Sequence, residues 1–167
     1  MPTSPKPGVL LYVKNLEQVA RFYERLLTLA VSRTEEDHIV LESEACQLIL
    51  HRLPPYIAES IVIQSSPEVR EGTPVKWLLP VPSIADARLL ASSLGGQVWP
   101  VEREWEFMDM RVCDGIDPEG NVFQLRQKVP EYLRASPSTR ASLQTIGGVS
   151  GDAEHCAPGD APQVERP

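Results

Sequence analysis

The feature that most constrains the fold is an internal repeat of a strand, a helix and three further strand-like runs. With an offset of 68 residues, apolar positions of the first strand and helix fall on equivalent positions of the second. The matched pairs include Leu10 and Leu78, Leu11 and Leu79, Val13 and Val81, Leu16 and Ile84, and Leu26 and Leu94. The last strands, 48–50 and 123–125, overlay with an offset of 75. Two β-α-β-β-β units are therefore expected.

The first unit starts with the apolar run 8–13, after which Asn15 is a predicted helix N-cap with Gln18 as its capping-box partner. The helix that follows has an apolar stripe, made of Leu16, Val19, Phe22, Tyr23, Leu26 and Leu27. Three strand-like runs at 29–32, 39–41 and 46–50 complete this unit.

The second unit follows the same pattern. A strand at 75–81 leads to Ser83, a predicted N-cap with Asp86 at its third position, and Gly95-Gly96 ends the helix. The stripe of this helix is Ile84, Ala87, Leu90, Ala91 and Leu94. Further runs are expected at 97–101, 108–113 and 122–126.

A tight turn leads into the last run. Asp117, Pro118 and Gly120 occupy the first, second and fourth places of a type I β-turn. In the strand that follows, Gln124 must lie on the opposite face from its two apolar neighbours. The turn therefore predicts a hairpin whose last strand carries a polar side chain at mid-length.

In each unit, a helix that packs on one face of a small sheet leaves the other face free to curve around a ligand. We therefore expect an α+β fold in which two βαβββ modules form a cup-shaped sheet. The predicted organisation is an N-terminal tail at 1–7, module one at 8–53, a connector at 54–74, module two at 75–127 and a C-terminal tail at 128–167. Residues 136–167 lack aromatic residues and are rich in Ser, Gly, Ala and Pro, which predicts disorder.

Composition limits the partners. A net charge of −7 without a Lys/Arg cluster argues against nucleic acid, whose phosphates attract cationic surfaces. No apolar run reaches the roughly 18 residues that span a bilayer, and residues 1–7 carry no apolar signal region, so no membrane association and a cytoplasmic location are expected. Cys46, Cys113 and Cys156 show no metal-type or redox-type spacing and are expected to be reduced thiols.

Two segments resemble the vicinal oxygen chelate superfamily, which contains glyoxalase I, bleomycin-resistance proteins, fosfomycin-resistance enzymes, extradiol dioxygenases and methylmalonyl-CoA epimerase. The run 8–16 with Arg21-Phe22-Tyr23 is similar to its opening strand and helix, and 117–125 is similar to its closing hairpin. The resemblance covers about residues 8–127. It implies the glyoxalase/bleomycin resistance/dihydroxybiphenyl dioxygenase fold, and a homodimer whose pockets form between modules of both chains.

The resemblance also implies where a metal would bind. In this superfamily His, Gln or Glu side chains at four strand positions hold a divalent ion, and those positions here are Gly8, Ile49, Lys76 and Gln124. Glycine and isoleucine offer no side-chain ligand, and an ammonium repels a cation, so only Gln124 could coordinate. We therefore expect no metal and no other cofactor.

Side chains that alternate along the strands predict the lining of the cup. The candidate ligand-binding residues are Tyr12, Gln47, His51, Lys76, Trp105, Gln124 and Arg126. Lys76 either extends into water or meets an anionic or carbonyl-bearing ligand. The aromatic loop 99–110, with Trp105, is either a lid over a flat ligand or an anchor onto the sheet or a second subunit.

These patterns predict a protein that is similar to glyoxalase and bleomycin-resistance proteins and binds a small organic molecule in the cup without a catalytic metal. One alternative is a metal-dependent enzyme of the lyase, isomerase or dioxygenase type. Another is a metal-free proton-transfer enzyme that uses Lys76, His51 or Tyr12. A third is a structural module that binds a partner through an exposed apolar surface. The sequence assigns no catalytic residue.

Overall fold

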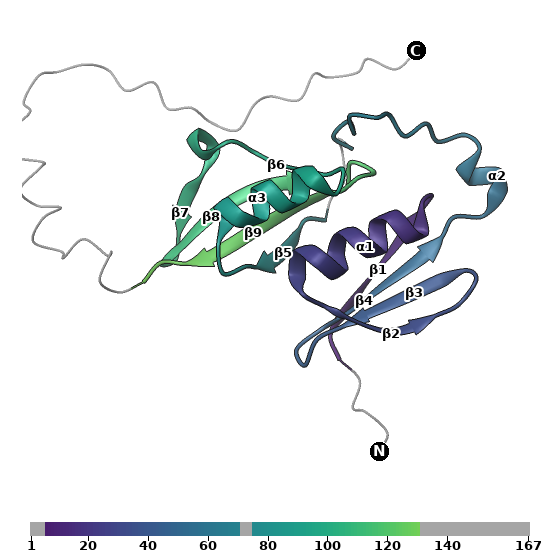
Figure 1. The fold of residues 1–167 in the computed structure, drawn as a ribbon, viewed down its shortest axis with the longest axis horizontal. Coiled ribbons are helices and arrows are strands. Elements are labelled where there is room, and N and C mark those ends of the chain that lie inside the picture. Colours follow the sequence, from purple (N-terminus) through teal and green to yellow (C-terminus); the bar gives the residue numbers. More distant parts are fainter. Residues whose placement is uncertain (1–5, 71–74, 131–167) are drawn as a thin grey trace, which may run out of the picture. The chain divides into compact units, whose positions relative to one another are not determined.

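The computed structural model describes residues 6–70 and 75–130 (Figure 1). Module one contains a four-stranded sheet with the order β1-β4-β3-β2. Its elements are β1 (Gly8–Val13), α1 (Leu16–Leu27), β2 (Ala30–Thr34), β3 (His38–Glu42) and β4 (Gln47–Arg52). The first and last strands pair in parallel and the others antiparallel, so α1, β2 and β3 together form the crossover that a parallel pair requires.

Module two repeats this topology in a five-stranded sheet, in which β5 pairs in parallel with β9. Its elements are β5 (Trp77–Pro80), α3 (Ile84–Ser93), β6 (Gln97–Val98), the 3-10 turn η1 (Val101–Arg103), β7 (Trp105–Phe107), β8 (Met110–Ile116) and β9 (Val122–Lys128). The predicted α+β class with two repeated units is confirmed. Between the modules, the connector contains a short helix, α2 (Pro55–Ala58).

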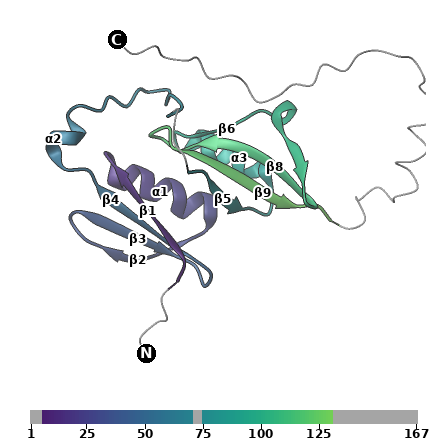
Figure 2. The same ribbon diagram turned by 180° about the vertical axis from the view of Figure 1, so that it is seen from behind.

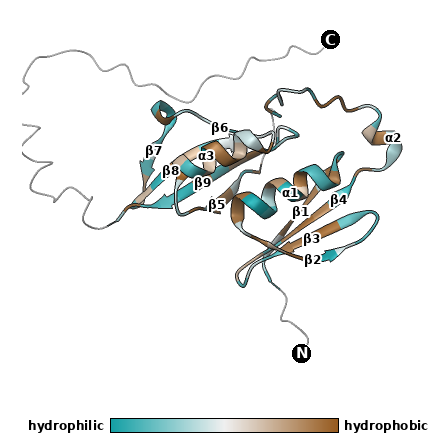
Figure 3. Cartoon of the chain, in the orientation of Figure 1, coloured by the Kyte–Doolittle hydropathy of each residue, from teal (hydrophilic) through white to brown (hydrophobic). Residues whose placement is uncertain are grey.

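Each long helix covers one face of its own sheet, as the opposite views of Figures 1 and 2 show. The strands β1, β3 and β4 are largely hydrophobic (Figure 3). Side chains of α1 join both modules in one buried core, because Phe22 lies 5.9 Å from Phe123 and Tyr23 lies 5.8 Å from Trp77 between ring centroids. The face of each sheet opposite its helix keeps exposed apolar residues, including Leu10 and Leu78.

The two long helices begin differently. The Ser83 hydroxyl accepts the backbone N–H of Asp86 at 3.2 Å, which confirms the predicted cap of α3. Asn15 is the N-cap residue of α1, as predicted, but the capping interaction expected from its side chain is wrong, because that side chain makes no capping hydrogen bond. The buried Glu119 carboxylate instead accepts the backbone N–H of Lys14 at 3.0 Å and of Asn15 at 2.6 Å. At the other end of α3, Gly95 has the expected left-handed backbone, with φ +86°.

The closing turn has the predicted form, since Gly120 N–H donates to the Asp117 carbonyl at 3.0 Å. The buried Asp117 carboxylate accepts three hydrogen bonds from Glu119 and Asn121 within the turn, and one from the Tyr23 hydroxyl at 3.1 Å. Burial raises the pKa of Asp117, and burial next to this carboxylate raises the pKa of Tyr23 well above its usual value. The turn is therefore fixed to α1 through a buried polar contact.

The predicted tails at 1–7 and 128–167 fall largely outside the described residues, as does the predicted disorder of 136–167. Within the described ranges, no helix is long and apolar enough to cross a membrane.

Candidate functional site

The open face of module two carries a row of polar side chains on neighbouring strands. In the register of the sheet, Gln124 on β9 lies between Leu78 on β5 and Asp114 on β8. Two residues further along β9, Arg126 lies opposite Val112. Residues that pair directly across strands share a face of the sheet, so these side chains project to the same side.

A continuous network joins four polar side chains: Lys76, Asp114, Gln124 and Arg126. Lys76 Nζ lies 2.7 Å from Asp114 Oδ2, and Gln124 Nε2 donates to Asp114 Oδ1 at 3.2 Å. Arg126 Nε donates to Gln124 Oε1 at 3.1 Å. The structure thus brings together three of the predicted site residues, Lys76, Gln124 and Arg126. The sequence analysis missed Asp114, the carboxylate that links two of them.

Aromatic residues border the network on the side of β7. The Arg126 guanidinium carbon lies 5.4 Å from the centroid of Phe107. Trp105 pairs with Val112 across β7 and β8, and is 41% exposed. The prediction that Trp105 belongs to a loop is wrong, because it lies on a strand that hydrogen-bonds to β8. In the register of the sheet, Val112 lies between Trp105 and Arg126, so the three side chains share one cross-strand row.

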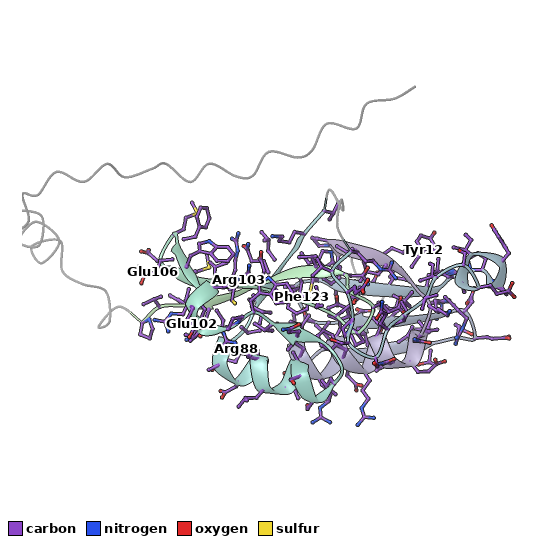
Figure 4. The ribbon with its side chains drawn as sticks, turned by 90° about the horizontal axis from the view of Figure 1, so that it is seen from above. Tyr12, Arg88, Glu102, Arg103, Glu106 and Phe123 are labelled. Carbon is purple, nitrogen blue, oxygen red and sulfur yellow. The ribbon has the colours of Figure 1, made fainter. Side chains whose placement is uncertain are left out.

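Side chains on the helix side of the sheet hold the start of β7 in place. Arg88 on α3 donates to the Trp99 carbonyl at 2.7 Å and pairs with the Glu104 carboxylate. Arg111 lies 3.6 Å from the same carboxylate. Figure 4 shows Arg88 on α3, and Glu102, Arg103 and Glu106 at the same end of module two. These contacts fix the strand that presents the aromatic residues.

The predicted residues Tyr12 and His51 form a separate cluster on module one. Their ring centroids are 5.6 Å apart, and His51 stacks on His38 at 6.0 Å. Asp37 lies 2.7 Å from His38 Nδ1 and 3.5 Å from His51 Nε2, and its hydrogen bond with His38 is the largest cause of its lowered pKa. Among the hydrogen bonds and ion pairs of the described residues, none joins this cluster to the Lys76 network.

Gln47 is the remaining predicted site residue, and it belongs to a third group. Its side-chain amide donates to Glu42 at 3.1 Å, while Lys6 and Ser32 bind the same carboxylate at 2.8 and 2.7 Å. These three hydrogen bonds, with that of Lys6 the largest contribution, lower the pKa of Glu42 to about 2. Gln47 therefore takes part in a local structural network at the start of β4.

A groove of about 240 Å³ runs beside the edge strands β1 and β5. Its lining is mostly apolar: Pro7, Gly8, Val9, Leu27, Leu29, Cys46, Gln47, Leu48, Trp77, Leu78 and Leu79. The Trp77 indole N–H is buried and has no hydrogen-bond acceptor among the described residues. Since Trp77 packs against the ring of Tyr23, its orphaned N–H belongs to the protein interior.

The four positions at which relatives of this kind would hold a metal do not fit a divalent ion. At Gly8, an added Cβ would lie 2.7 Å from the Gln47 carbonyl oxygen, so any larger residue requires a shift of the strand. Ile49 is apolar, and the Lys76 ammonium and the Gln124 amide both donate to Asp114. A cation here would have to displace an ammonium, with one carboxylate to bind it.

Comparison with known proteins places these features in context. A family model described as a glyoxalase-like domain matches residues 8–126. This match confirms the resemblance inferred from the opening strand and helix and from the closing hairpin. A search of curated proteins finds no match.

Solved structures share the fold at low sequence identity. A glyoxalase/bleomycin resistance protein/dioxygenase family enzyme from Burkholderia phytofirmans is 14% identical, covers 73% of this chain and 97% of its own, and has a TM-score of 0.57. A fosfomycin resistance protein from Listeria monocytogenes is 14% identical, covers 77% and 97%, and has a TM-score of 0.53. A mutant of that Listeria protein, complexed with Mn(II) and a dihydroxypropylphosphonic acid, is 13% identical, covers 78% and 94%, and has a TM-score of 0.53. At such identities these likenesses define the fold alone.

Proposed function

The chain belongs to the glyoxalase-like domain family, and from this premise we propose that it binds a small organic molecule on the open face of module two without a catalytic metal. In this proposal residues 8–127 form the ligand-binding domain, and the tail 128–167 lies outside it. The observation that carries the proposal is the network of Lys76, Asp114, Gln124 and Arg126 on a sheet face that also carries exposed apolar side chains.

Burial and exposure support this site. Leu78 is 53% exposed and Phe107 47% exposed, so apolar surface is accessible on the face that carries the polar network. A few convergent polar groups among apolar side chains are typical of small-molecule sites. The apolar residues would supply contact area, and the polar network would fix the orientation of the ligand.

The donor set at the family's metal positions supports a function without a metal. The Listeria protein of similar fold is complexed with Mn(II). In this chain the two polar side chains at those positions, Lys76 and Gln124, both donate hydrogen bonds and are already bound to Asp114. The residues of this face can bind a ligand through hydrogen bonds and apolar contacts alone.

We further propose that the protein acts as a homodimer, in which a second copy helps to enclose the open sheet faces. Exposed apolar side chains on both sheets support this, among them Leu10, Tyr12 and Leu78. Size-exclusion chromatography with light scattering tests the proposal, and a monomer at micromolar concentration would refute it.

A second candidate function is proton transfer on module one. The contact of His51 Nε2 with Asp37, and the position of the Tyr12 ring next to His51, favour it. An imidazole beside a carboxylate is a common general base. This candidate predicts a reaction that is lost in His51→Gln and kept in Gln124→Ala.

Native mass spectrometry of the protein purified from its own host, with metal analysis of the same sample, tests the main proposal. We expect a retained organic molecule, less than stoichiometric divalent metal, and loss of the molecule in Gln124→Ala. The control Gln97→Ala changes an exposed glutamine of the same sheet and should retain it. A stoichiometric divalent ion that Gln124→Ala releases would overturn the metal-free function.

A further inference from the structure

Arg126 differs from the other charged residues of the network because no carboxylate of residues 6–70 or 75–130 pairs with it. The ammonium of Lys76 is neutralised by Asp114 at 2.7 Å. Arg126 makes one hydrogen bond, from Nε to the neutral Gln124 amide, and no acidic side chain of the described residues lies within ion-pair distance of it. An arginine is always charged, so an unneutralised cation stands in the middle of the sheet face.

Two contacts hold the guanidinium group of Arg126, and neither of them is a hydrogen bond from its terminal nitrogens. Nε is held by Gln124, and Cζ lies 5.4 Å from the Phe107 centroid. No hydrogen bond among the described residues uses either terminal nitrogen, Nη1 or Nη2. These two nitrogens form the parallel pair of donors that matches the two oxygens of a carboxylate.

The local charge also favours an anion. Lys128 projects from β9 two residues after Arg126, on the same face, and has no acidic partner within the described chain. Within the part of the chain that the structure describes, three cations thus share this face with one carboxylate, Asp114, although the whole chain has a net charge of −7. Glu106 lies on β7 opposite Arg111, and thus on the helix side of the sheet.

We propose that the ligand of this face is a small organic carboxylate with a flat apolar body. Its two oxygens bind the terminal nitrogens of Arg126, and its apolar part lies against Trp105 and Phe107. The inference rests on the proposed function and adds the chemical class of the ligand. The planar fork and the positive charge of Arg126 select a planar anion rather than a neutral or cationic molecule.

Two probes that share one ring system and differ in charge test this: 2-naphthoate and the neutral 2-naphthamide. Calorimetric titration of the full chain should give about tenfold tighter binding of the carboxylate, the worth of one charge-assisted contact. Arg126→Gln should remove this preference and leave the affinity for the amide within about twofold of wild type. The control Lys128→Gln removes the same charge from the same strand face and should keep most of the preference.

Arg126→Lys provides the second variant. It keeps the charge without the planar fork, and should lose at least half of the carboxylate preference even if Arg126→Gln does not fold. Equal binding of both probes to wild type would overturn the carboxylate class while leaving the proposed small-molecule function intact. Absence of binding by either probe up to about 1 mM would also overturn it, and the native mass spectra then decide the proposed function independently.

Discussion

The carboxylate of Glu119 accepts the backbone N–H of Asn15 at 2.6 Å, across 104 residues of sequence. The same carboxylate accepts the N–H of Lys14 and lies 3.3 Å from Arg70, and its side chain is fully buried. Glu119, in the closing turn, therefore binds both the N-terminus of the first helix and Arg70 of the connector. This contact explains why the opening helix and the closing hairpin act as one structural unit.

Glu119→Ala should destabilise the protein by about 3 kcal/mol, because it leaves the part-buried backbone N–H groups of Lys14 and Asn15 without their acceptor and removes the ion pair with Arg70. The thermal midpoint should fall by roughly 10 °C. Chemical and thermal unfolding measure both effects. Glu59→Ala, which removes an exposed glutamate of the connector, is the control and should change stability by less than about 0.5 kcal/mol. A loss this small in Glu119→Ala would contradict the capping role.

Glu42 should make stability depend on pH. Its pKa falls from 4.5 to about 2 in the folded state, so the native state binds fewer protons than the unfolded state between these values. Its stabilising contribution is therefore present above pH 4.5 and is lost as the pH falls toward 2. The urea midpoints of wild type and Glu42→Gln should differ at pH 6 and converge near pH 2. The exposed Glu44, changed to Gln, is the matched control for removing a carboxylate near this strand, and a difference between wild type and Glu42→Gln that stays constant from pH 6 to pH 2 would refute the assignment.

Asp114→Asn should strengthen the binding of 2-naphthoate by about two- to fivefold, because it removes the negative charge of Asp114 from the face and leaves the charge of Lys76 without this carboxylate. The same calorimetric titration measures the change. Glu106→Gln removes a negative charge from the opposite face of the same sheet and should change the affinity by less than about twofold. Weaker binding of 2-naphthoate in Asp114→Asn would contradict this prediction, because it would mean that the Asp114 side chain helps to hold the ligand.

Gly96→Ala should cost about 1–3 kcal/mol through overpacking. An added Cβ would lie 2.4 Å from Phe22 Cε2 and 2.7 Å from the Ile116 carbonyl oxygen, so the contact between α1 and the end of α3 must open. Unfolding in denaturant measures this loss. Ser92→Ala, an exposed change four residues earlier, serves as the control. If both variants are equally stable, the core between the modules is less tightly packed than these distances imply.

The features that the sequence predicted well are those that depend on nearby residues. Ser83 caps its own helix, Gly95 ends it, and Gly120 closes a four-residue turn, so local rules suffice for each. The local pattern correctly placed Asn15 at the start of its helix, but it could not predict that Glu119 binds the Asn15 backbone N–H, because no local pattern connects these two residues. The sequence did not predict this contact because Asn15 and Glu119 are 104 residues apart along the chain.

The site was predicted only in part for a similar reason. Asp114 could have been found from the hairpin, because it lies directly opposite Gln124 across β8 and β9. Strand β7 was not predicted because its turn to β8 has no recognisable turn sequence. In this turn Met108 and Asp109 both have left-handed backbones, with φ 46° and 58°. Such turns favour Asn and Gly, and Met108 gives no such signal. The aromatic segment therefore resembled a loop.

The position of the first helix cap has a consequence for synthesis. The sheet of module one is complete once Arg52 has been made, yet α1 lacks its cap until Glu119 follows. At about 5–20 residues per second, a ribosome delivers that carboxylate several seconds later. During this interval the nascent first module carries an unfinished helix terminus, and a chaperone that recognises incomplete domains would have time to bind it.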